Sequence, residues 1–500
     1  MKKITILMVC FFMINQNISA QNNKYDNEWI ISSTEDSVNI INWSGKEPTI
    51  RLKKRYKFTD GFDMTSICNK SGHLKYFTYG CSIMSNDAND WLPNAKDINS
   101  GYIYKSYCMN PAGSYPTYNL MTFIPMPDDS NKYVLFHSSL EKDSFQFYPP
   151  RKLNYTIIDA SLNNGIGDAT KKNESILYNR LSHTGVKACK HGNGRDWWII
   201  APQLGFHGYY TTLLSPQGIS KPNFQLINQD SLYQGDWQGQ SVFSPDGSIY
   251  VRADPTNGVS VMKFDRCNGK LSNLTTLVDT FSVDCTGVAI SPNSRFLYVS
   301  LRSWLLQYDL EAKDIQESMV LVGTYDGFVS PTCSICQTSF YKCQLAPNGK
   351  IYMGATNSME FLHVIHKPNL KGELCNFRQH DLELPRWFFV ALPNIPNYNL
   401  GAKIGSPCEK ALSVSEEKFV ANNIMVYPNP VSSILHISVS ELYTALVIYD
   451  INGRVLKNIK TNNYQADYQL DVSDMAAGVY IISGVAENGK RIGAQRFVVE

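Results

Sequence analysis

The densest cluster of side chains that could do chemistry is the run 190–198, which reads Lys-His-Gly-Asn-Gly-Arg-Asp-Trp-Trp. Near neutral pH histidine can act as a base or a metal ligand, and arginine can hold a carboxylate with two parallel hydrogen bonds. Tryptophan offers a flat apolar ring on which a sugar can stack. These residue types predict ligand binding at five positions: His191, Asn193, Arg195, Asp196 and Trp197.

The same run also fits a purely structural role. Asn193-Gly194 is a typical pair for reversing the chain between two strands. Arg195 and Asp196 can pair with each other at the edge of a sheet. Because neighbouring residues of a strand point to opposite faces, at least one of Trp197 and Trp198 belongs in a core. Both interpretations stay open at the level of sequence.

Motifs for metal binding or catalysis are weak elsewhere in the chain. The turn at 127–131, Pro-Asp-Asp-Ser-Asn, lacks the glycine and the distal glutamate of a calcium loop. Neither Gly-x-Ser-x-Gly nor His-Glu-x-x-His occurs, and there is no glycine-rich phosphate loop. Zinc would require three histidines on separate loops to converge, namely His183, His191 and His207. We therefore assign no catalytic residue and expect no metal and no cofactor.

The cysteines favour disulfides over a metal site. Eleven cysteines follow residue 20, and in an exported protein this odd number predicts disulfides with at least one free thiol. The spacing of Cys333, Cys336 and Cys343 resembles the start of a thiolate zinc pattern. Such sites normally add a second close pair of cysteines or histidines, which is missing here.

The N-terminus carries the features of a targeting segment. Lys2 and Lys3 precede a short apolar run, and small residues end it at Ala20, which predicts a secretory signal peptide over residues 1–20. No later stretch is apolar enough to span a bilayer. Lys and Arg number 46 against 44 Asp and Glu. This near balance gives no basic surface for nucleic acid, so no nucleic-acid partner is expected.

A short sequence motif that occurs three times predicts the elements that must position any site. Residues 244–251, 291–299 and 346–353 each place Pro before Asp or Asn and follow with alternating apolar residues. Asp, Asn and Gly allow a tight reversal between two strands, whereas Pro suits the end of the first strand. Hairpins recurring about every 50 residues are typical of a β-propeller, with one small sheet per repeat.

The spacing of the hairpins predicts an all-β propeller of about seven blades over residues 21–408. A strand near Trp29, or one near 388–391, is expected to close the ring. We interpret the repeated hairpins as scaffold. A binding site is therefore expected in the non-repeating insertions, with the loop around His191 as the first candidate.

The chain changes character after the predicted propeller. Residues 409–424 are polar and charged, as in a linker. Residues 425–500 contain about seven short apolar stretches separated by Asn-Gly and Ala-Gly turns, which predicts a small β-sandwich.

This tail resembles the type A C-terminal sorting domain of the type IX secretion system of Bacteroidetes. The similarity rests on spaced motifs that include Tyr427-Pro-Asn-Pro430, Ile448–Arg454 and Ala477–Tyr480. The resemblance implies export across both membranes, with the secretion machinery as a partner and a final place outside the cell or on its surface. The implied sorting-signal residues are Tyr427, Pro428, Asn429, Pro430, Asp450, Gly453, Gly478 and Tyr480.

Residues 60–408 resemble a propeller-like region of large secreted proteins from the same bacteria. The matching stretches include 68–72, 191–198 and 264–271. The hairpin with Arg295, Tyr298 and Val299 is also similar to surface-layer and lactonase-type propeller repeats. These resemblances imply architecture and location but no chemistry.

The sequence thus predicts a secreted or surface-displayed propeller that binds an unknown protein or glycan. A repeat scaffold without a catalytic motif commonly presents variable loops on one rigid face. The alternatives are a hydrolase or lactonase with an active site in the central funnel, and a structural component of the cell envelope.

Overall fold

The computed structural model describes most of the predicted propeller and sandwich. The predicted signal peptide and residues 410–423 of the predicted linker lie outside the described residues. The described ranges are 23–31, 37–54, 63–109, 114–117, 119–142, 148–231, 239–277, 285–388, 392–409, 424–439, 443–451, 453–461, 467–485 and 491–500.

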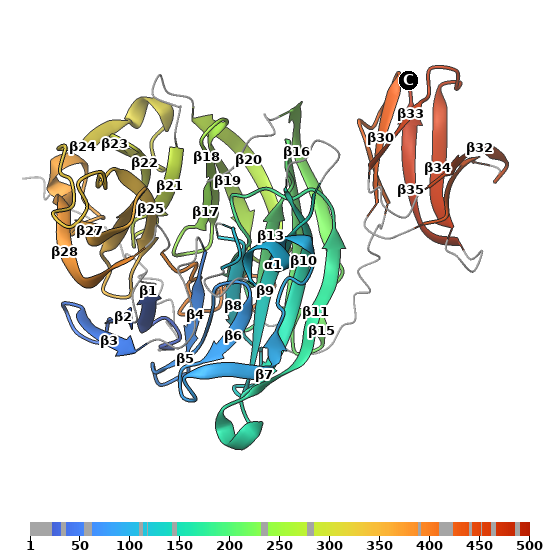
Figure 1. Cartoon of the computed structure of the whole chain (residues 1–500). Helices are drawn as coiled ribbons and strands as arrows, with labels where there is room; N and C mark the ends of the chain where they lie inside the picture. Colours follow the sequence, from blue (N-terminus) through green and yellow to red (C-terminus); the bar gives the residue numbers. More distant parts are fainter. Residues whose placement is uncertain are drawn as a thin grey trace, which may run out of the picture.

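In the described part of the body, seven antiparallel sheets stand side by side around an axis (Figure 1). The first three sheets contain β1 (Glu28–Ile31), β2 (Ser37–Asn42), β3 (Thr49–Lys54); β4 (Thr65–Cys68), β5 (Leu74–Thr78), β6 (Ser82–Ser85), β7 (Asp90–Lys96); and β8 (Met121–Pro125), β9 (Lys132–Leu140), β10 (Pro150–Asp159), β11 (Asp168–Tyr178). The fourth contains β12 (Lys187–Lys190), β13 (Trp197–Pro202), β14 (Phe206–Ser215), β15 (Gly218–Ile219) and β16 (Asn223–Ser231).

The last three sheets are regular four-stranded units. They contain β17 (Gln240–Phe243), β18 (Ile249–Asp254), β19 (Gly258–Asp265), β20 (Lys270–Leu277); β21 (Cys285–Ile290), β22 (Phe296–Leu301), β23 (Trp304–Asp309), β24 (Val320–Thr324); and β25 (Phe340–Leu345), β26 (Ile351–Ala355), β27 (Met359–Ile365), β28 (Phe377–Phe388). The first strands of successive sheets are neighbours and line the axis. The architecture confirms the predicted all-β propeller, and each sheet is a blade, numbered 1 to 7 along the chain.

The three repeated phrases form the tight turns that the sequence predicts. Each turn joins the first two strands of blades 5, 6 and 7. A backbone N–H donates to the carbonyl three residues earlier, from Gly247 to Ser244 at 2.8 Å and from Gly349 to Ala346 at 2.9 Å. Gly247 has a φ of +73°, which glycine adopts without the steric cost that a Cβ would add.

Blade 1 closes the ring against blade 7. The Asn39 side chain on β2 exchanges two hydrogen bonds with the Arg386 backbone on β28, at 2.8 and 3.2 Å. The Trp43 and Tyr352 rings lie 4.7 Å apart between centroids. The predicted closing segment near Trp29 is therefore part of a blade, since Trp29 lies in β1; residues 389–391 of the other candidate lie outside the described residues.

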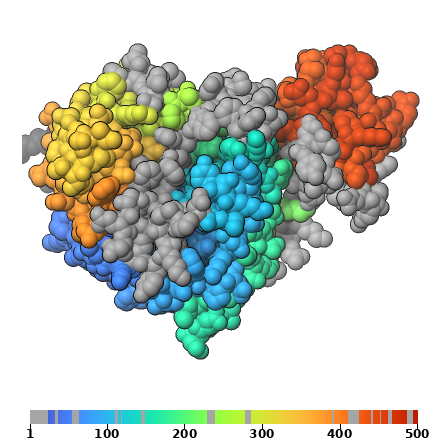
Figure 2. Space-filling model, viewed as in Figure 1, coloured from blue at the N-terminus to red at the C-terminus, as the bar shows by residue number. Residues whose placement is uncertain are grey.

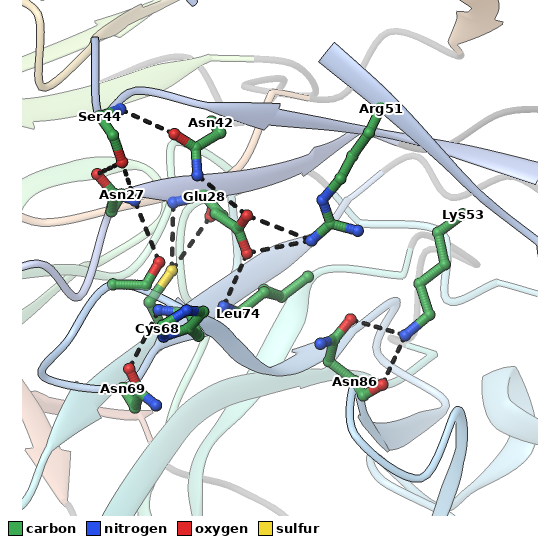
Figure 3. A network of polar contacts seen from close by, with 12 residues as sticks. Asn27, Glu28, Asn42, Ser44, Arg51, Lys53, Cys68, Asn69, Leu74 and Asn86 are labelled. Carbon is green, nitrogen blue, oxygen red and sulfur yellow. Dashed lines mark hydrogen bonds and ion pairs between the residues drawn. The ribbon is translucent and has the colours of Figure 1, made fainter. Parts of the chain in front are cut away.

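A buried carboxylate joins blade 1 to blade 2 (Figure 3). Glu28 on β1 accepts hydrogen bonds from the Asn42 side chain at 3.1 Å, from Arg51 at 3.2 Å and from the Leu74 amide at 2.9 Å. Burial raises the pKa of Glu28, but these hydrogen bonds and the Arg51 charge outweigh burial and leave the pKa below its usual value. The Glu28 carboxylate therefore accepts hydrogen bonds from residues of three other strands.

The C-terminal unit is a sandwich of two antiparallel sheets. One sheet has the order β29–β30–β33, from β29 (Ile424–Tyr427), β30 (Ile434–Val439) and β33 (Asp467–Asp471). The other has the order β32–β31–β34–β35, from β31 (Ala445–Asp450), β32 (Val455–Lys460), β34 (Gly478–Val485) and β35 (Arg491–Val499). A separate hydrophobic core lies between the two sheets, which agrees with the predicted sandwich.

In the described residues the helices are few and short. They are α1 (Tyr102–Tyr107) and three single 3₁₀ turns at Asn163–Gly165, Gln316–Ser318 and Gly372–Cys375. None of the helices in the described ranges is long and apolar enough to cross a membrane.

The cysteines of the described residues divide into bonded and free ones, as the sequence predicts. Three disulfides join Cys81–Cys108, Cys267–Cys408 and Cys333–Cys336. The Cys333–Cys336 bond takes up the two thiols of the zinc-like spacing, so that pair is not a metal site. The free thiols are all buried: Cys68, Cys189, Cys285, Cys343 and Cys375.

One asparagine connects the inner strands of blades 2, 3 and 4. The segment after β28 returns to the axis, where the side-chain amide of Asn394 donates to the backbone carbonyls of Met121 at 2.8 Å and Val186 at 3.0 Å. The Asn394 side-chain oxygen accepts a hydrogen bond from Lys187, and its backbone carbonyl accepts one from Thr65 at 3.1 Å. A single residue therefore satisfies polar groups from three blades.

A glutamine has the same role for blades 5, 6 and 7. The Gln240 side chain on β17 accepts from the backbone amides of Val288 at 3.1 Å and Cys343 at 3.2 Å, and it donates to the Cys343 carbonyl at 2.7 Å. Gln240 and Asn394 are both buried.

Three ionisable side chains are buried near these two amides. Burial lowers the pKa of Lys187 to about 7 and that of Lys342 to about 7, although the charge of Asp63 opposes both shifts. Lys342 donates to the Gly239 carbonyl at 2.9 Å. Burial raises the pKa of Asp63, against a hydrogen bond from the Leu120 amide at 2.7 Å and the charge of Lys342.

We predict that Asn394→Ala destabilises the fold much more than Asn397→Ala does. Asn397 is exposed, and its side chain makes two hydrogen bonds, donating to the Pro245 carbonyl at 2.8 Å and accepting from the Asn399 amide at 3.0 Å, so it is a matched control. Loss of the buried amide leaves several polar groups without partners, which costs about 3 kcal/mol or more, against about 1 kcal/mol or less for the control. Urea unfolding of both variants measures the difference, and equal costs would contradict the role of Asn394.

A second prediction concerns pH. Because the pKa of Lys187 is lower in the folded chain than in the unfolded chain, the unfolded chain binds more protons between pH 7 and pH 10.5. The free energy of unfolding should therefore rise with pH across this window. From pH 7.5 to 9.5 we expect Lys187→Met to remove about 2 kcal/mol of that rise.

The control for this measurement is Lys105→Met, which changes an exposed lysine on α1. In urea unfolding at several pH values, the free energy of unfolding of the control should depend on pH as that of the wild type does. An unchanged slope in Lys187→Met would show that Lys187 is charged in the folded protein throughout this range.

Candidate functional site

The run 190–198 forms the turn between β12 and β13 in blade 4. The His191 amide donates to the Asp196 carbonyl at 2.8 Å, and the Gly194 amide donates to the His191 carbonyl at 2.9 Å. Gly194 has a φ of +73°. The predicted Asn-Gly turn is therefore present, and it brings the predicted binding residues together.

Both ring nitrogens of His191 are already used within the protein. Nε2 lies 2.9 Å from the Cys267 carbonyl and must donate its proton there, whereas Nδ1 accepts from the Asn193 amide at 3.0 Å. The ring is buried, and burial lowers the pKa of His191 despite these hydrogen bonds. His191 is a neutral side chain that fixes the turn to blade 5.

Asn193, Arg195 and Asp196 form one polar network. The Asn193 amide and the Arg195 guanidinium both donate to the Asp196 carboxylate, at 2.8 and 2.7 Å. Arg195 reaches further to Asp128 in the turn of blade 3, at 3.0 Å. Of these three side chains Arg195 is the most exposed, with 24% of its surface accessible, so it is the member of the network that a ligand can reach.

Trp197 lies in the hydrophobic core with 1% of its surface exposed. Its ring packs edge-on against Tyr398, and Lys190 Nζ lies 4.7 Å from the ring centroid. Trp198 is also buried. The ring of Trp197 therefore has no free face for a sugar. Burial, together with the nearby Arg266 charge, lowers the pKa of Lys190 to about 8.

A groove of about 350 Å³ runs beside this turn. Its walls come from the N-terminal segment, the blade 2 turn, the blade 3 turn and the blade 4 turn. They are lined by Asn23, Tyr25, Lys70, residues 125–130, Lys190, Gly194, Arg195 and Trp197. The acid-rich turn at 127–131 thus contributes to a hollow together with Arg195, and the groove carries charges of both signs.

A second hollow, a cavity of about 270 Å³, lies at the propeller axis, where the alternative hydrolase or lactonase hypothesis predicts a funnel site. Its rim includes the prolines of all three repeated hairpins, Pro245, Pro292 and Pro347, with Pro396 of the returning segment. The hairpins are therefore scaffold and also line a cavity. The sequence signal that could have indicated this cavity is the proline at the same position of each of the three repeats.

The axial cavity is mainly apolar, and besides the thiols of Cys189 and Cys343 its ionisable side chains are Asp26 and Lys187. Burial raises the pKa of Asp26 to about 6, and burial lowers that of Lys187 to about 7. Both groups can thus change charge near neutral pH. The other polar side chains of the lining are Ser244, Gln344, Asn397 and Asn399.

Within the described residues, no group of three or more His, Cys, Asp or Glu side chains is placed to hold a metal ion. His183, His191 and His207 form no such group.

The implied sorting-signal residues shape the sandwich. Asn429, in the Tyr427–Pro430 run, accepts from the Val498 amide at 2.8 Å and so holds the final strand. Asp450 accepts from the Gly453 amide at 3.0 Å in the turn between β31 and β32. The Tyr480 hydroxyl, two residues after Gly478, donates to the Ala476 carbonyl at 2.6 Å.

The fold has distant likenesses among solved structures. A protein from Lactobacillus plantarum aligns at a TM-score of 0.42 and 12% identity, covering 73% of this chain and 98% of its own. PorZ, a bacterial surface component of the type IX secretion system of Porphyromonas gingivalis, aligns at 0.35 and 13%, covering 93% and 56%. A putative 6-phosphogluconolactonase from Bacteroides fragilis aligns at 0.38 and 11%, covering 72% and 97%. Likenesses at this level carry no information on activity.

A search of the curated proteins finds no match for the chain. The comparison with protein families gives a specific result for the tail: residues 425–500 match the family described as "Secretion system C-terminal sorting domain". This match confirms the predicted sorting domain. The chain is a propeller protein that the type IX secretion system exports to the cell surface or beyond.

Proposed function

We propose that the propeller, residues 21–408, binds a protein partner outside the cell through the face that carries the groove and the axial cavity. The observation that carries this proposal is that the two hollows share a wall. Residues 23–26 contribute Asn23 and Tyr25 to the groove and Asp26 to the cavity. The Asn23 amide donates to Asn399 of the returning segment at 2.8 Å, which fixes this wall.

The lining of the two hollows favours a protein over a glycan. An apolar cavity with a few polar groups suits an apolar side chain, and a groove with both charges suits a polar peptide segment. Sugar binding would use exposed aromatic rings, whereas Trp197 and Tyr25 are both buried. Of the residues predicted from sequence, we infer that Arg195 contacts the ligand, whereas His191, Asn193 and Asp196 hold its turn.

A hydrolase or lactonase remains the second candidate because of one observation. Asp26 and Lys187 line the same apolar cavity, and their pKa values lie near neutrality. Such shifts are typical of groups that transfer protons in active sites. In that case Asp26→Asn and Lys187→Met would each abolish turnover of a lactone or ester by the purified protein.

We predict that Lys70→Glu and Pro292→Trp weaken binding of the protein partner at least about tenfold. Lys70 is an exposed cation of the groove, and Pro292 lies at the rim of the axial cavity, which a tryptophan would fill. The partner is first identified by cross-linking the full chain to proteins of the cell surroundings. Its affinity for each purified variant is then measured by calorimetry.

The matched control is Lys105→Glu, which reverses the charge of an exposed lysine on α1, outside both linings. It should bind within about twofold of wild type. Equal affinities for Lys70→Glu, Pro292→Trp and the control would place binding elsewhere. If the protein is a structural component of the envelope, no partner should bind it saturably. Binding on a glycan array without any protein partner would overturn the proposal that the ligand is a protein.

A further inference from the structure

The connection between blades 6 and 7 forms a short hairpin that ends in a disulfide. Val329 and Gln337 pair as an antiparallel bridge, and the Ser330 amide donates to the Cys336 carbonyl at 3.0 Å. At the tip Cys336 is bonded to Cys333, with only two residues between them. This Cys-x-x-Cys disulfide belongs to neither of the two hollows.

Hydrogen bonds hold the hairpin in place independently of the disulfide. The buried carboxylate of Glu360, on β27, accepts from the Ser330 hydroxyl at 2.9 Å and from the Thr332 hydroxyl at 2.8 Å. At the base of the hairpin the Thr338 amide donates to the Phe328 carbonyl at 3.2 Å. The tip is thus fixed to blade 7 by contacts that do not involve the sulfur atoms.

The disulfide also constrains little of the chain. Its two cysteines are 3 positions apart, against 27 for Cys81–Cys108 and 141 for Cys267–Cys408. The entropy that a disulfide removes from the unfolded chain grows with the length of the loop that it closes. Of the three disulfides in the described residues, Cys333–Cys336 should therefore contribute least to stability.

The two sulfur atoms differ in accessibility. Cys336 exposes 9% of its surface, whereas Cys333 is half-buried. Between them Ser334 is exposed, and Ile335 exposes 85% of its surface. A thiolate from solvent can therefore reach Cys333 more easily than Cys336. Ile335 offers an apolar contact to a peptide that approaches the accessible sulfur.

The hairpin lies away from the sorting domain and from the proposed binding face. Blades 6 and 7, yellow to orange in Figure 2, are on the side of the molecule far from the sandwich, as Figure 1 also shows. The hairpin precedes β25, whereas the turn at 346–349 that borders the axial cavity follows this strand. The hairpin and the axial cavity are therefore at opposite ends of β25.

We propose that Cys333–Cys336 is a redox-active disulfide that oxidises a dithiol in an apolar peptide segment. A thiolate of the peptide attacks Cys333 Sγ, the sulfur–sulfur bond breaks, and Cys336 leaves as a thiolate. The second peptide thiolate attacks the peptide sulfur of this mixed disulfide and releases Cys333. Two electrons pass from the peptide to the protein, and the two protons of the peptide dithiol end on Cys333 and Cys336.

The spacing of the two cysteines suits repeated exchange. When Cys333 is bonded to another thiol, Cys336 remains two residues away and acts as an intramolecular thiol at high effective concentration. Thiols in Cys-x-x-Cys motifs commonly have a larger thiolate fraction than a free cysteine. An external disulfide can therefore re-form Cys333–Cys336 after each exchange.

The test uses the purified full chain and a synthetic peptide that contains two cysteines flanked by apolar residues. With oxidised glutathione as the final electron acceptor, the initial rate of peptide oxidation should exceed the protein-free rate at least about tenfold. The variant C333S/C336S should lower the rate to the protein-free value. Mass spectrometry of the peptide measures both rates, and a wild-type rate equal to the protein-free rate would overturn the proposal.

Cys81–Cys108 supplies the matched control, because both of its cysteines are half-buried and it closes a longer loop. The variant C81S/C108S should oxidise the peptide at the wild-type rate. If this variant does not fold, the comparison is made within the wild type by brief treatment with dithiothreitol, alkylation and mass spectrometry. Cys333 and Cys336 should be alkylated at least about tenfold faster than Cys81 and Cys108, and equal rates would make Cys333–Cys336 an ordinary structural disulfide.

Two single substitutions test which sulfur is attacked. Cys336→Ser leaves Cys333 as an accessible thiol, which should gain one glutathione when the protein is mixed with oxidised glutathione. Cys333→Ser leaves the shielded thiol of Cys336, which should form this adduct at least about tenfold more slowly. Equal rates of adduct formation, measured by mass spectrometry of the intact protein, would contradict the assignment of Cys333 as the attacked sulfur.

Discussion

The propeller depends on how the polar groups at its axis are satisfied. Inner strands that meet around an axis have backbone groups facing it, and a buried group without a partner costs free energy comparable to a lost hydrogen bond. Asn394 serves blades 2 to 4, and Gln240 serves blades 5 to 7. A carboxamide suits this position because it both donates and accepts without carrying a charge.

This closure also determines where the two hollows lie. The segment that brings Asn394 to the axis continues over the turn face and meets the N-terminal segment at Asn399. Together the two segments divide that face into the polar groove and the apolar cavity. The two hollows are therefore a consequence of closing the ring, and under the proposed function residues 23–26 and 396–400 would take part in both stability and binding.

The repeats made the propeller predictable, because a tight turn such as the one at Gly247 requires particular residue types, and these residue types are visible in the sequence. The sandwich was predictable for the same reason. The residues that line the axial cavity were not predictable, since Asp26, Lys187 and Asn397 are far apart in the chain and no local pattern links them. His191 shows the converse: its residue type suggested chemistry, but both its ring nitrogens are occupied by the Cys267 carbonyl and the Asn193 amide.

The sorting domain meets a constraint that an ordinary sandwich does not. It must stay folded beside the propeller and still present a surface that the export machinery can distinguish from the rest of the chain. A polar contact such as Asn179–Ser438 with the propeller can be weak and reversible.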